Sequence, residues 1–328
     1  MCRLVSGAWG WRCGVLQISA MGHGKLKKFA ENETFRCLLQ PLAGEILDKE
    51  PGSKALRVRD HAIKGRWGRE MFGNDHPIVL ELGCGKGDYT IALALRNPEI
   101  NYIGVDIKGA RLWKGAKFAT ENALPNVAFL RTRIEFIEAF FGPSEVAEIW
   151  LTFSDPQLRG SENARLSSPL FLERYRKFLK PEGLVHLKTD SRYLYEYTQA
   201  VCKVNGLPVY VSSTDVYRQG TLIPKSPSLR SGPSHCASGL WAPPSYVAEG
   251  GHGFGDECPL PIDLSAVTEV QTFYEKMFLE MGLPITYMAF GIGHEGAYRY
   301  PGDAFDHEYW LEAEGPRRSF SHQPTKKA

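Results

Sequence analysis

The first residues that could do chemistry are an acid and three glycines in the run Glu81-Leu-Gly-Cys-Gly-Lys-Gly87. Gly83, Gly85 and Gly87 have no Cβ, so a turn built from them can pass close to a bound nucleoside. Asp106 follows roughly twenty residues later, where a strand-end carboxylate accepts hydrogen bonds from both ribose hydroxyls in dinucleotide-binding folds. Together, the turn and the acid predict a site for a nucleoside-containing cofactor.

Two cofactors compete for this pattern. The fingerprint for NAD is G-x-G-x-x-G, whereas the third glycine here comes one residue early. The sulfonium of S-adenosylmethionine is positively charged and the molecule has no pyrophosphate. The Glu81 carboxylate beside the turn would attract the sulfonium and would repel the pyrophosphate of NAD. The pattern therefore favours S-adenosylmethionine over NAD.

A further acid, Asp155, lies in the sequence Phe153-Ser-Asp-Pro156, directly after another apolar run. The proline fixes the backbone of this turn. In this topology the turn lies at the edge of the methyl-donor pocket, so Asp155 is predicted to face the reaction. An Asp-Pro turn without a chemical role is the alternative.

These residues follow short apolar runs that alternate with helical patterns. Strands are predicted over 78–82, 101–106, 126–131, 147–153 and 184–189. Helices are predicted over 88–96, 108–122, 134–141 and 192–204, with another from Ser168 to 180–183. Repeated strand–helix units predict a doubly wound α/β fold with a parallel sheet and right-handed crossovers. A helix over 267–281 and a strand over 285–290 follow.

Composition limits the function classes. The chain has 328 residues, 43% of them hydrophobic, and a net charge of +2, so binding to a polyanion requires a local basic cluster. The seven cysteines form no C-x-x-C pair, which predicts reduced thiols and no metal site. No apolar run reaches the roughly 18 residues of a membrane span. A cytoplasmic enzyme without a metal or a membrane partner is expected, as a monomer or a homodimer.

Five regions follow from these patterns. Residues 1–20 are predicted to be a non-core extension before Met21, in preference to a signal peptide. Residues 21–75 are predicted to be an N-terminal RNA-binding or lid segment, and 76–290 the catalytic domain. Within that domain, 221–264 is a Pro/Ser/Gly-rich insert predicted to be a partly disordered loop. Residues 291–328 are predicted to be a polar tail.

Seven blocks, in this order, resemble the bacterial tRNA (guanine-N7-)-methyltransferases. They lie between Lys25 and Phe290: LKKFAENETF (26–35), LELGCGKGDYT (80–90), GVDIKGARLWKGAK (104–117), FLRTRIEFIE (129–138), SDPQ (154–157), FLERYRKFLKPEGLVHLKTD (171–190) and QTFYEKMFLEMGLP (271–284). The resemblance implies a Rossmann-like class I methyltransferase fold of about seven strands with an antiparallel last strand. It also implies methyl transfer from S-adenosylmethionine to N7 of a guanosine in the tRNA variable loop.

The resemblance also implies roles for individual residues. Glu81 and Asp106 match the cofactor carboxylates, and Thr132 and Arg133 lie in the segment near the adenine. Asp155 matches the catalytic acid at the edge of the cofactor site. The predicted substrate-binding residues are Arg159, Asp190, and Thr272 and Glu275 of the T-x-x-E motif.

Two basic groups are candidates for binding tRNA phosphates. Lys25, Lys27 and Lys28 lie in the N-terminal segment; Lys108, Arg111, Lys114 and Lys117 recur at every third residue or so along a predicted helix. A solvated charged helix face explains the second group equally well, although no acid interrupts residues 107–120. That absence favours a phosphate track.

Two departures from the family pattern are visible. Ser154 replaces the usual proline before the catalytic acid, and the basic run that follows keeps only Arg159 and Arg165. The resemblance therefore implies a weaker grip on RNA beside the methyl donor. Two alternative functions remain open: a methyltransferase acting on another substrate, and an RNA-binding relative without turnover.

Overall fold

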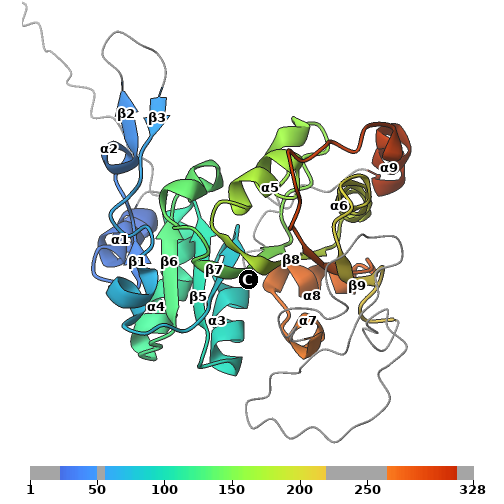
Figure 1. Cartoon of the computed structure of the whole chain (residues 1–328). Coiled ribbons are helices and arrows are strands. Elements are labelled where there is room, and N and C mark those ends of the chain that lie inside the picture. The colour runs from blue at the N-terminus through green and yellow to red at the C-terminus, as the bar shows by residue number, and fades with distance from the viewer. Residues whose placement is uncertain (1–22, 50–55, 219–263, 316–328) are drawn as a thin grey trace, which may run out of the picture.

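Most strands of the chain form one twisted sheet (Figure 1). The computed structural model describes residues 23–49, 56–218 and 264–315, so the predictions for 1–20, for 221–263 and for the end of the tail lie outside the described residues. In the described part, eight strands lie in the order β1-β6-β5-β4-β7-β8-β10-β9. Their bounds are β1 Leu38–Leu39, β4 Ile78–Leu82, β5 Asn101–Asp106, β6 Val127–Arg131, β7 Val146–Thr152, β8 Leu179–Thr189, β9 Val209–Ser213 and β10 Thr286–Gly291.

The strand directions confirm the predicted fold class. Strands β6, β5, β4, β7 and β8 pair in parallel, while β10 is antiparallel to both β8 and β9. The short edge strand β1 and strand β9 were not predicted, and they bring the sheet to eight strands instead of about seven. The carboxyl ends of β4, β5, β7 and β8 therefore meet at one edge of the sheet, where ligands bind in such folds.

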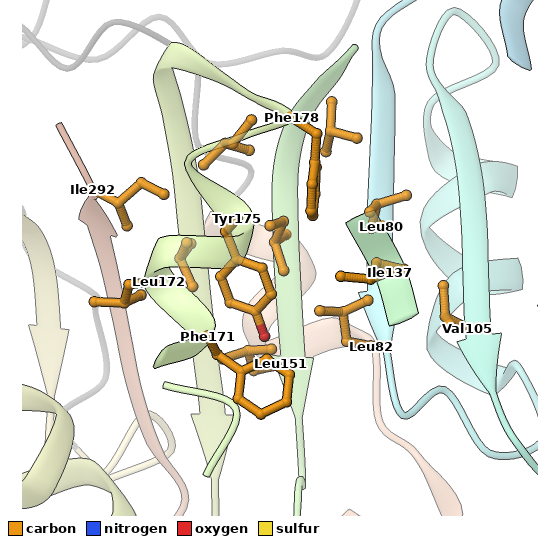
Figure 2. Packing of buried hydrophobic residues seen from close by; sticks show 14 of the residues in the cluster. Leu80, Leu82, Val105, Ile137, Leu151, Phe171, Leu172, Tyr175, Phe178 and Ile292 are labelled. Carbon is orange, nitrogen blue, oxygen red and sulfur yellow. The ribbon is translucent and has the colours of Figure 1, made fainter. Parts of the chain in front are cut away.

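Helices cover both faces of the sheet. On one face lie α3 (Asp88–Arg96), α4 (Gly109–Glu121), α7 (Leu264–Glu269) and α8 (Phe273–Glu280); on the other lie α5 (Pro169–Tyr175) and α6 (Arg192–Val204). Leu80 and Leu82 lie beside Ile137, in the same core as Leu172 and Tyr175 of α5 (Figure 2). Val79 belongs to the core on the opposite face. This alternation is the two-residue period of a strand that is buried on both sides.

The N-terminal segment is part of this core. Helix α1 (His23–Asn32) packs against α4, and the helical turn η1 (Trp67–Phe72) buries Trp67, whose Nε1 donates to the Phe140 carbonyl at 2.8 Å. Between them come α2 (Ala43–Ile46) and the hairpin of β2 (Leu47–Lys49) and β3 (Leu56–Val58), which stands apart from the main sheet (Figure 1). The role predicted for 21–75 in binding RNA stays a prediction.

Several predicted elements differ from the structure. The segment after β6 is a 3-10 turn, η2 (Ile134–Ala139), not an α-helix. Helix α5 ends at Tyr175, and strand β8 already begins at Leu179, before the predicted Lys180-Pro-Glu-Gly stop. The pairing of β8 with β7 shifts register between Val146 and Glu148, and the chain packs closely there: a Cβ on Gly183 would lie 2.5 Å from Cγ of Leu179.

The helix predicted over 267–281 is two helices, α7 and α8, because Thr272 begins a new one. The predicted polar tail also begins with ordered structure. It contains the turn η4 (Gly302–Ala304) and helix α9 (His307–Glu314), which packs against α6 (Figure 1).

Candidate active site

The glycine turn follows β4 and has two different surroundings. Gly83, Gly85 and Gly87 have φ angles of +82°, +58° and +75°, which disfavour any residue with a Cβ. A Cβ added to Gly83 or Gly85 would meet no atom within 4 Å, so these two glycines border open space. A Cβ on Gly87 would lie 2.5 Å from the Phe129 ring. Gly87 is therefore required by packing, and only the first two leave room for a ligand.

Asp106, at the end of β5, binds this turn. Its Oδ2 accepts from the backbone N–H of Gly85 at 3.0 Å, and its Oδ1 accepts from that of Lys108 at 2.7 Å. Each carboxylate oxygen has a second lone pair. The side chain is thus held rigidly beside the open face of the turn and can still accept hydrogen bonds from a diol.

Glu81 lies beneath the turn and not in it. Its Oε2 accepts from the backbone N–H of Thr90 at 2.8 Å and from the Thr90 hydroxyl; its Oε1 accepts from the Thr152 hydroxyl at 2.5 Å. Burial raises its pKa to about 7, against the lowering effect of these hydrogen bonds. Glu81 thus ties β4, β7 and the start of α3 together, and its role as a direct cofactor ligand stays a prediction.

The loop after β7 presents Asp155 to solvent. Its Oδ1 accepts from the backbone N–H of Gln157 at 2.9 Å, and the residue is exposed. Phe153 and Gln157, on either side, have φ angles of +50° and +51°. A non-glycine residue in this conformation costs about 1–3 kcal/mol and persists where the surrounding structure enforces it. The loop is therefore a strained turn that displays a carboxylate.

The two departures from the family pattern lie in the same loop. Ser154 Oγ is buried and has no hydrogen-bond partner among the described residues. Arg159 is exposed and its predicted contact with RNA stays a prediction, whereas Arg165 is buried. Arg165 Nε donates to the Pro156 carbonyl at 3.2 Å, so this arginine holds the loop from behind.

Strand β8 ends next to this loop. Thr152 of β7 pairs with Lys188 of β8, and the Phe153 N–H donates to the Lys188 carbonyl at 2.8 Å. Asp190 comes two residues after Lys188 and is partly buried. The register therefore brings Asp155 and Asp190 to adjacent strand ends.

The T-x-x-E motif forms the start of helix α8. Thr272 Oγ1 accepts from the Glu275 N–H at 3.1 Å, and Glu275 Oε2 accepts from the Thr272 N–H at 3.3 Å, which is a capping box. The side chain of Glu275 is 0% exposed, and its Oε1 lies 2.7 Å from Nζ of the equally buried Lys188. Tyr217 also donates to this oxygen at 2.7 Å. As the chain is folded here, the Glu275 carboxylate faces the protein interior, and the predicted contact with guanosine stays a prediction.

Lys188 was not singled out from the sequence. Burial lowers the pKa of its ammonium group, whereas the Glu275 carboxylate raises it. Its Nζ also donates to the Val270 carbonyl at 3.0 Å and lies 5.2 Å from the centre of the Tyr89 ring. The sequence signal for Lys188 is its place at the end of an apolar strand. A lysine buried there needs a partner that is also buried.

The two candidate residues after β6 differ in exposure: Thr132 is buried and Arg133 faces solvent. Thr132 is buried, and its hydroxyl lies 3.4 Å from the Arg133 carbonyl. The Arg133 side chain points outward and pairs with Glu135 at 2.9 Å. That contact raises the pKa of Arg133 and lowers that of Glu135. Only Thr132 is therefore placed at the protected end of the strand.

The two predicted basic groups lie on packed helices, α1 and α4. Lys28 and Lys117 place their Nζ atoms 4.6 and 5.1 Å from the centre of the same Trp113 ring. Lys27 pairs with Glu31 at 3.9 Å, Lys114 with Asp88 at 2.9 Å and Lys117 with Glu121 at 3.6 Å. Within the described part of the chain, Lys25, Lys108 and Arg111 are exposed and form no ion pair. Because α1 packs against α4, the two groups lie on adjoining helices, and their exposed cations form a basic face that also contains Glu31, Asp88 and Glu121.

Phe273 is a second side chain that the sequence did not single out. It directly follows Thr272 and is 59% exposed, and Lys86 Nζ lies 5.0 Å from the centre of its ring. Lys86 belongs to the glycine turn, so this contact places the start of α8 beside that turn. In the described residues, no three His, Cys, Asp or Glu side chains are grouped as a metal site, and no helix is long and apolar enough to cross a membrane.

Comparisons with known proteins identify methyltransferases as relatives of this chain. Residues 75–221 match a family described as "Putative methyltransferase". A tRNA (guanine-N(7)-)-methyltransferase from Christiangramia forsetii is 41% identical over 82% of this chain and 97% of its own length. One of the same name from Bacteroides thetaiotaomicron is 39% identical over 86% of this chain and 90% of its own. A solved antibiotic-related methyltransferase is 14% identical and covers 68% of this chain and 90% of its own, with a TM-score of 0.43.

Proposed function

The chain belongs to the tRNA (guanine-N(7)-)-methyltransferase family, and we propose that it transfers a methyl group from S-adenosylmethionine to N7 of a guanosine in tRNA. The observation that carries this proposal is the joint placement of the open glycine turn, Asp106 and Asp155 at the carboxyl edge of one parallel sheet. We place the target guanosine in the variable loop and the enzyme in the cytoplasm.

The described residues fit the cofactor. The open space beside Gly83 and Gly85 accommodates a nucleoside, and Asp106 is fixed where it can accept hydrogen bonds from the two ribose hydroxyls. Thr132 lies at the end of the next strand, on the side assigned to the adenine. Glu81 supports the turn from below. The bound cofactor supplies an electrophilic methyl group on a positively charged sulfur.

The substrate side of the site is assigned to Asp155 and Asp190. Asp155 uses Oδ1 to hold its own loop, which leaves Oδ2 free to accept a hydrogen bond from the guanine edge or ribose. Asp190 lies at the adjacent strand end and fixes the same nucleoside from a second direction. Guanine N7 has a lone pair at neutral pH, so the reaction needs no general base. Catalysis then rests on orientation, and well-positioned groups reach effective molarities of about 10⁵–10⁸ M.

Glu275 takes a positioning role in this proposal. It holds Lys188 and Tyr217 and, with Thr272, fixes the first turn of α8 beside the glycine turn. Asp155 also places a negative charge near the ring, which becomes positive on methylation.

The basic face of α1 and α4 is assigned to the tRNA phosphates. Lys25, Lys108 and Arg111 are exposed there, and Arg159 is exposed in the Asp155 loop. Phosphate contacts orient an RNA without selecting its sequence. Because each neutralised phosphate releases counterions, the affinity for tRNA should fall steeply with salt.

The decisive experiment identifies the product. Purified protein is incubated with labelled S-adenosylmethionine and an unmodified tRNA transcript, and the digested RNA is analysed by nucleoside. The matched control is a transcript in which adenosine replaces the variable-loop guanosine. Label in 7-methylguanosine from the first transcript alone supports the proposal. Label in another nucleoside refutes the assigned product, and no transfer despite cofactor binding supports the RNA-binding alternative.

A further inference from the structure

We infer that the C-terminal segment 292–315, which contains α9, is a positioning element for the Asp155 loop, acting through Tyr193 and Arg165. The inference rests on the proposed function for its kinetic consequence, but the contacts themselves are independent of it. The segment crosses the end of α6 and packs on it far from the basic face of α1 and α4 (Figure 1).

Arg165 is the link to the loop. It is 4% exposed, and its Nε donates to the Pro156 carbonyl at 3.2 Å, one residue beyond Asp155. Its guanidinium carbon lies 5.0 and 4.5 Å from the ring centres of Tyr193 and Tyr197, and its contact with a carboxylate is a distant one, to Glu162 at 3.9 Å. A buried cation held mainly by π faces and neutral oxygens depends on the geometry of each partner.

Tyr193 passes this restraint to the C-terminal segment. Its hydroxyl accepts from Arg165 Nη2 at 2.6 Å, and it lies 2.5 Å from Nδ1 of His307 in α9. Arginine can only donate, so the Tyr193 oxygen accepts from Arg165, and the same hydroxyl is hydrogen-bonded to Nδ1 of His307. These hydrogen bonds therefore connect Arg165 to His307 through the one hydroxyl group of Tyr193.

Further contacts keep α9 in this place. Glu314 Oε2 accepts from the Tyr193 N–H at 2.9 Å, which satisfies a donor in the first turn of α6. The Phe305 ring stands edge-on to Tyr193 at 5.1 Å. Tyr300 donates to the side chain of Asn163, inside the stretch that follows Asp155. The segment thus contacts the loop directly at Asn163 and indirectly through Tyr193, and it caps the helix that begins just after Asp190.

The loop needs such a restraint because it is strained. Phe153 and Gln157 both occupy the left-handed region, so without external contacts the loop would relax to other conformations. Pro156 lies between them, and its carbonyl is the group that Arg165 holds. Removing the contact between Tyr193 and His307 should therefore displace Asp155 and leave cofactor binding unchanged.

The test compares variants on and off this chain. Tyr193→Phe removes the hydroxyl and keeps the ring, and His307→Leu removes the hydrogen-bonding imidazole at the protein surface. His307→Gln offers an amide that can donate or accept in its place, and Tyr309→Leu is the matched control, because Tyr309 is exposed on the same helix. Hydrogen exchange of the 153–165 amides, cofactor affinity, and kcat and KM for tRNA are measured for each.

We expect faster exchange of the 153–165 amides in Tyr193→Phe and His307→Leu, with kcat lowered by about tenfold to a hundredfold and cofactor affinity unchanged. His307→Gln should recover part of the loss, and Tyr309→Leu should match the wild type. Unchanged exchange in both Tyr193→Phe and His307→Leu would refute the inference. If the wild type itself methylates no tRNA, the proposed function fails, and the exchange result still decides whether the segment restrains the loop.

Discussion

Replacing Glu81 with glutamine should change the pH dependence of folding stability in a calculable way. Burial raises the pKa of Glu81 to about 7, from a value of 4.5 for an exposed glutamate. The folded state therefore binds this proton more tightly than the unfolded state does. The stability that the protonated carboxyl confers is fully present below pH 4.5 and is lost as the pH rises through about 7. The loss at pH 7 and above amounts to about 3 kcal/mol.

Glutamine resembles the protonated carboxyl and does not titrate, so the Glu81→Gln variant lacks this loss. Its oxygen can still accept from the Thr90 N–H, while its amide group can donate to the Thr152 hydroxyl. Urea unfolding of both proteins at several values between pH 5 and 8 gives the two stability curves. The wild type should lose stability relative to the variant by about 2.5 kcal/mol between pH 5 and 8, most of it below pH 7. Parallel curves would refute the assignment of a buried, titrating Glu81.

The other predictions concern the ion pair, the turn and the cofactor carboxylate. Lys188→Met should lower the free energy of unfolding in urea by about 3–5 kcal/mol, because it leaves the buried Glu275 carboxylate without its cation. Adding Glu275→Met should recover part of that loss. A Lys188→Met variant as stable as the wild type would contradict the pairing. Gly87→Ala should lower stability by about 2–5 kcal/mol, while Gly85→Ala should chiefly weaken S-adenosylmethionine binding in calorimetry. If both variants changed stability and S-adenosylmethionine binding to the same extent, the division into a packing glycine and a ligand-facing glycine would be wrong. Asp106→Asn should weaken the same binding by about tenfold to a hundredfold, and unchanged affinity would remove Asp106 from the site.

The strands and the turn could be predicted because their signals are local. Apolar runs such as Ile78–Leu82 have the length and residue types of strands buried on both faces, and each glycine of the turn has the positive φ that only glycine adopts easily. The order of the blocks indicated the family, which the relatives confirm.

Side-chain partners distant in sequence could not be predicted. No sequence pattern indicates that Thr90 and Thr152 donate hydrogen bonds to the two carboxylate oxygens of Glu81. The pairing of Lys188 with Glu275 depends on how α8 packs against the sheet, which no local pattern specifies.

One missed boundary did have a local signal. Thr272 and Glu275 form the T-x-x-E signature of a helix start, and the break between α7 and α8 falls there. The same two residues therefore begin α8, besides matching the substrate-binding motif of the family. Where a helical pattern of apolar residues runs through such a capping box, the capping box marks the start of a separate helix.

The central claim is tested most directly by single-turnover methyl transfer to tRNA with Asp155→Asn. Asparagine keeps the Oδ1 that accepts from Gln157, so the loop should hold its shape while the negative charge and the second acceptor are lost. We predict that 7-methylguanosine forms at least about a hundredfold more slowly in the variant, although S-adenosylmethionine still binds. A variant that forms 7-methylguanosine at the wild-type rate would contradict the account.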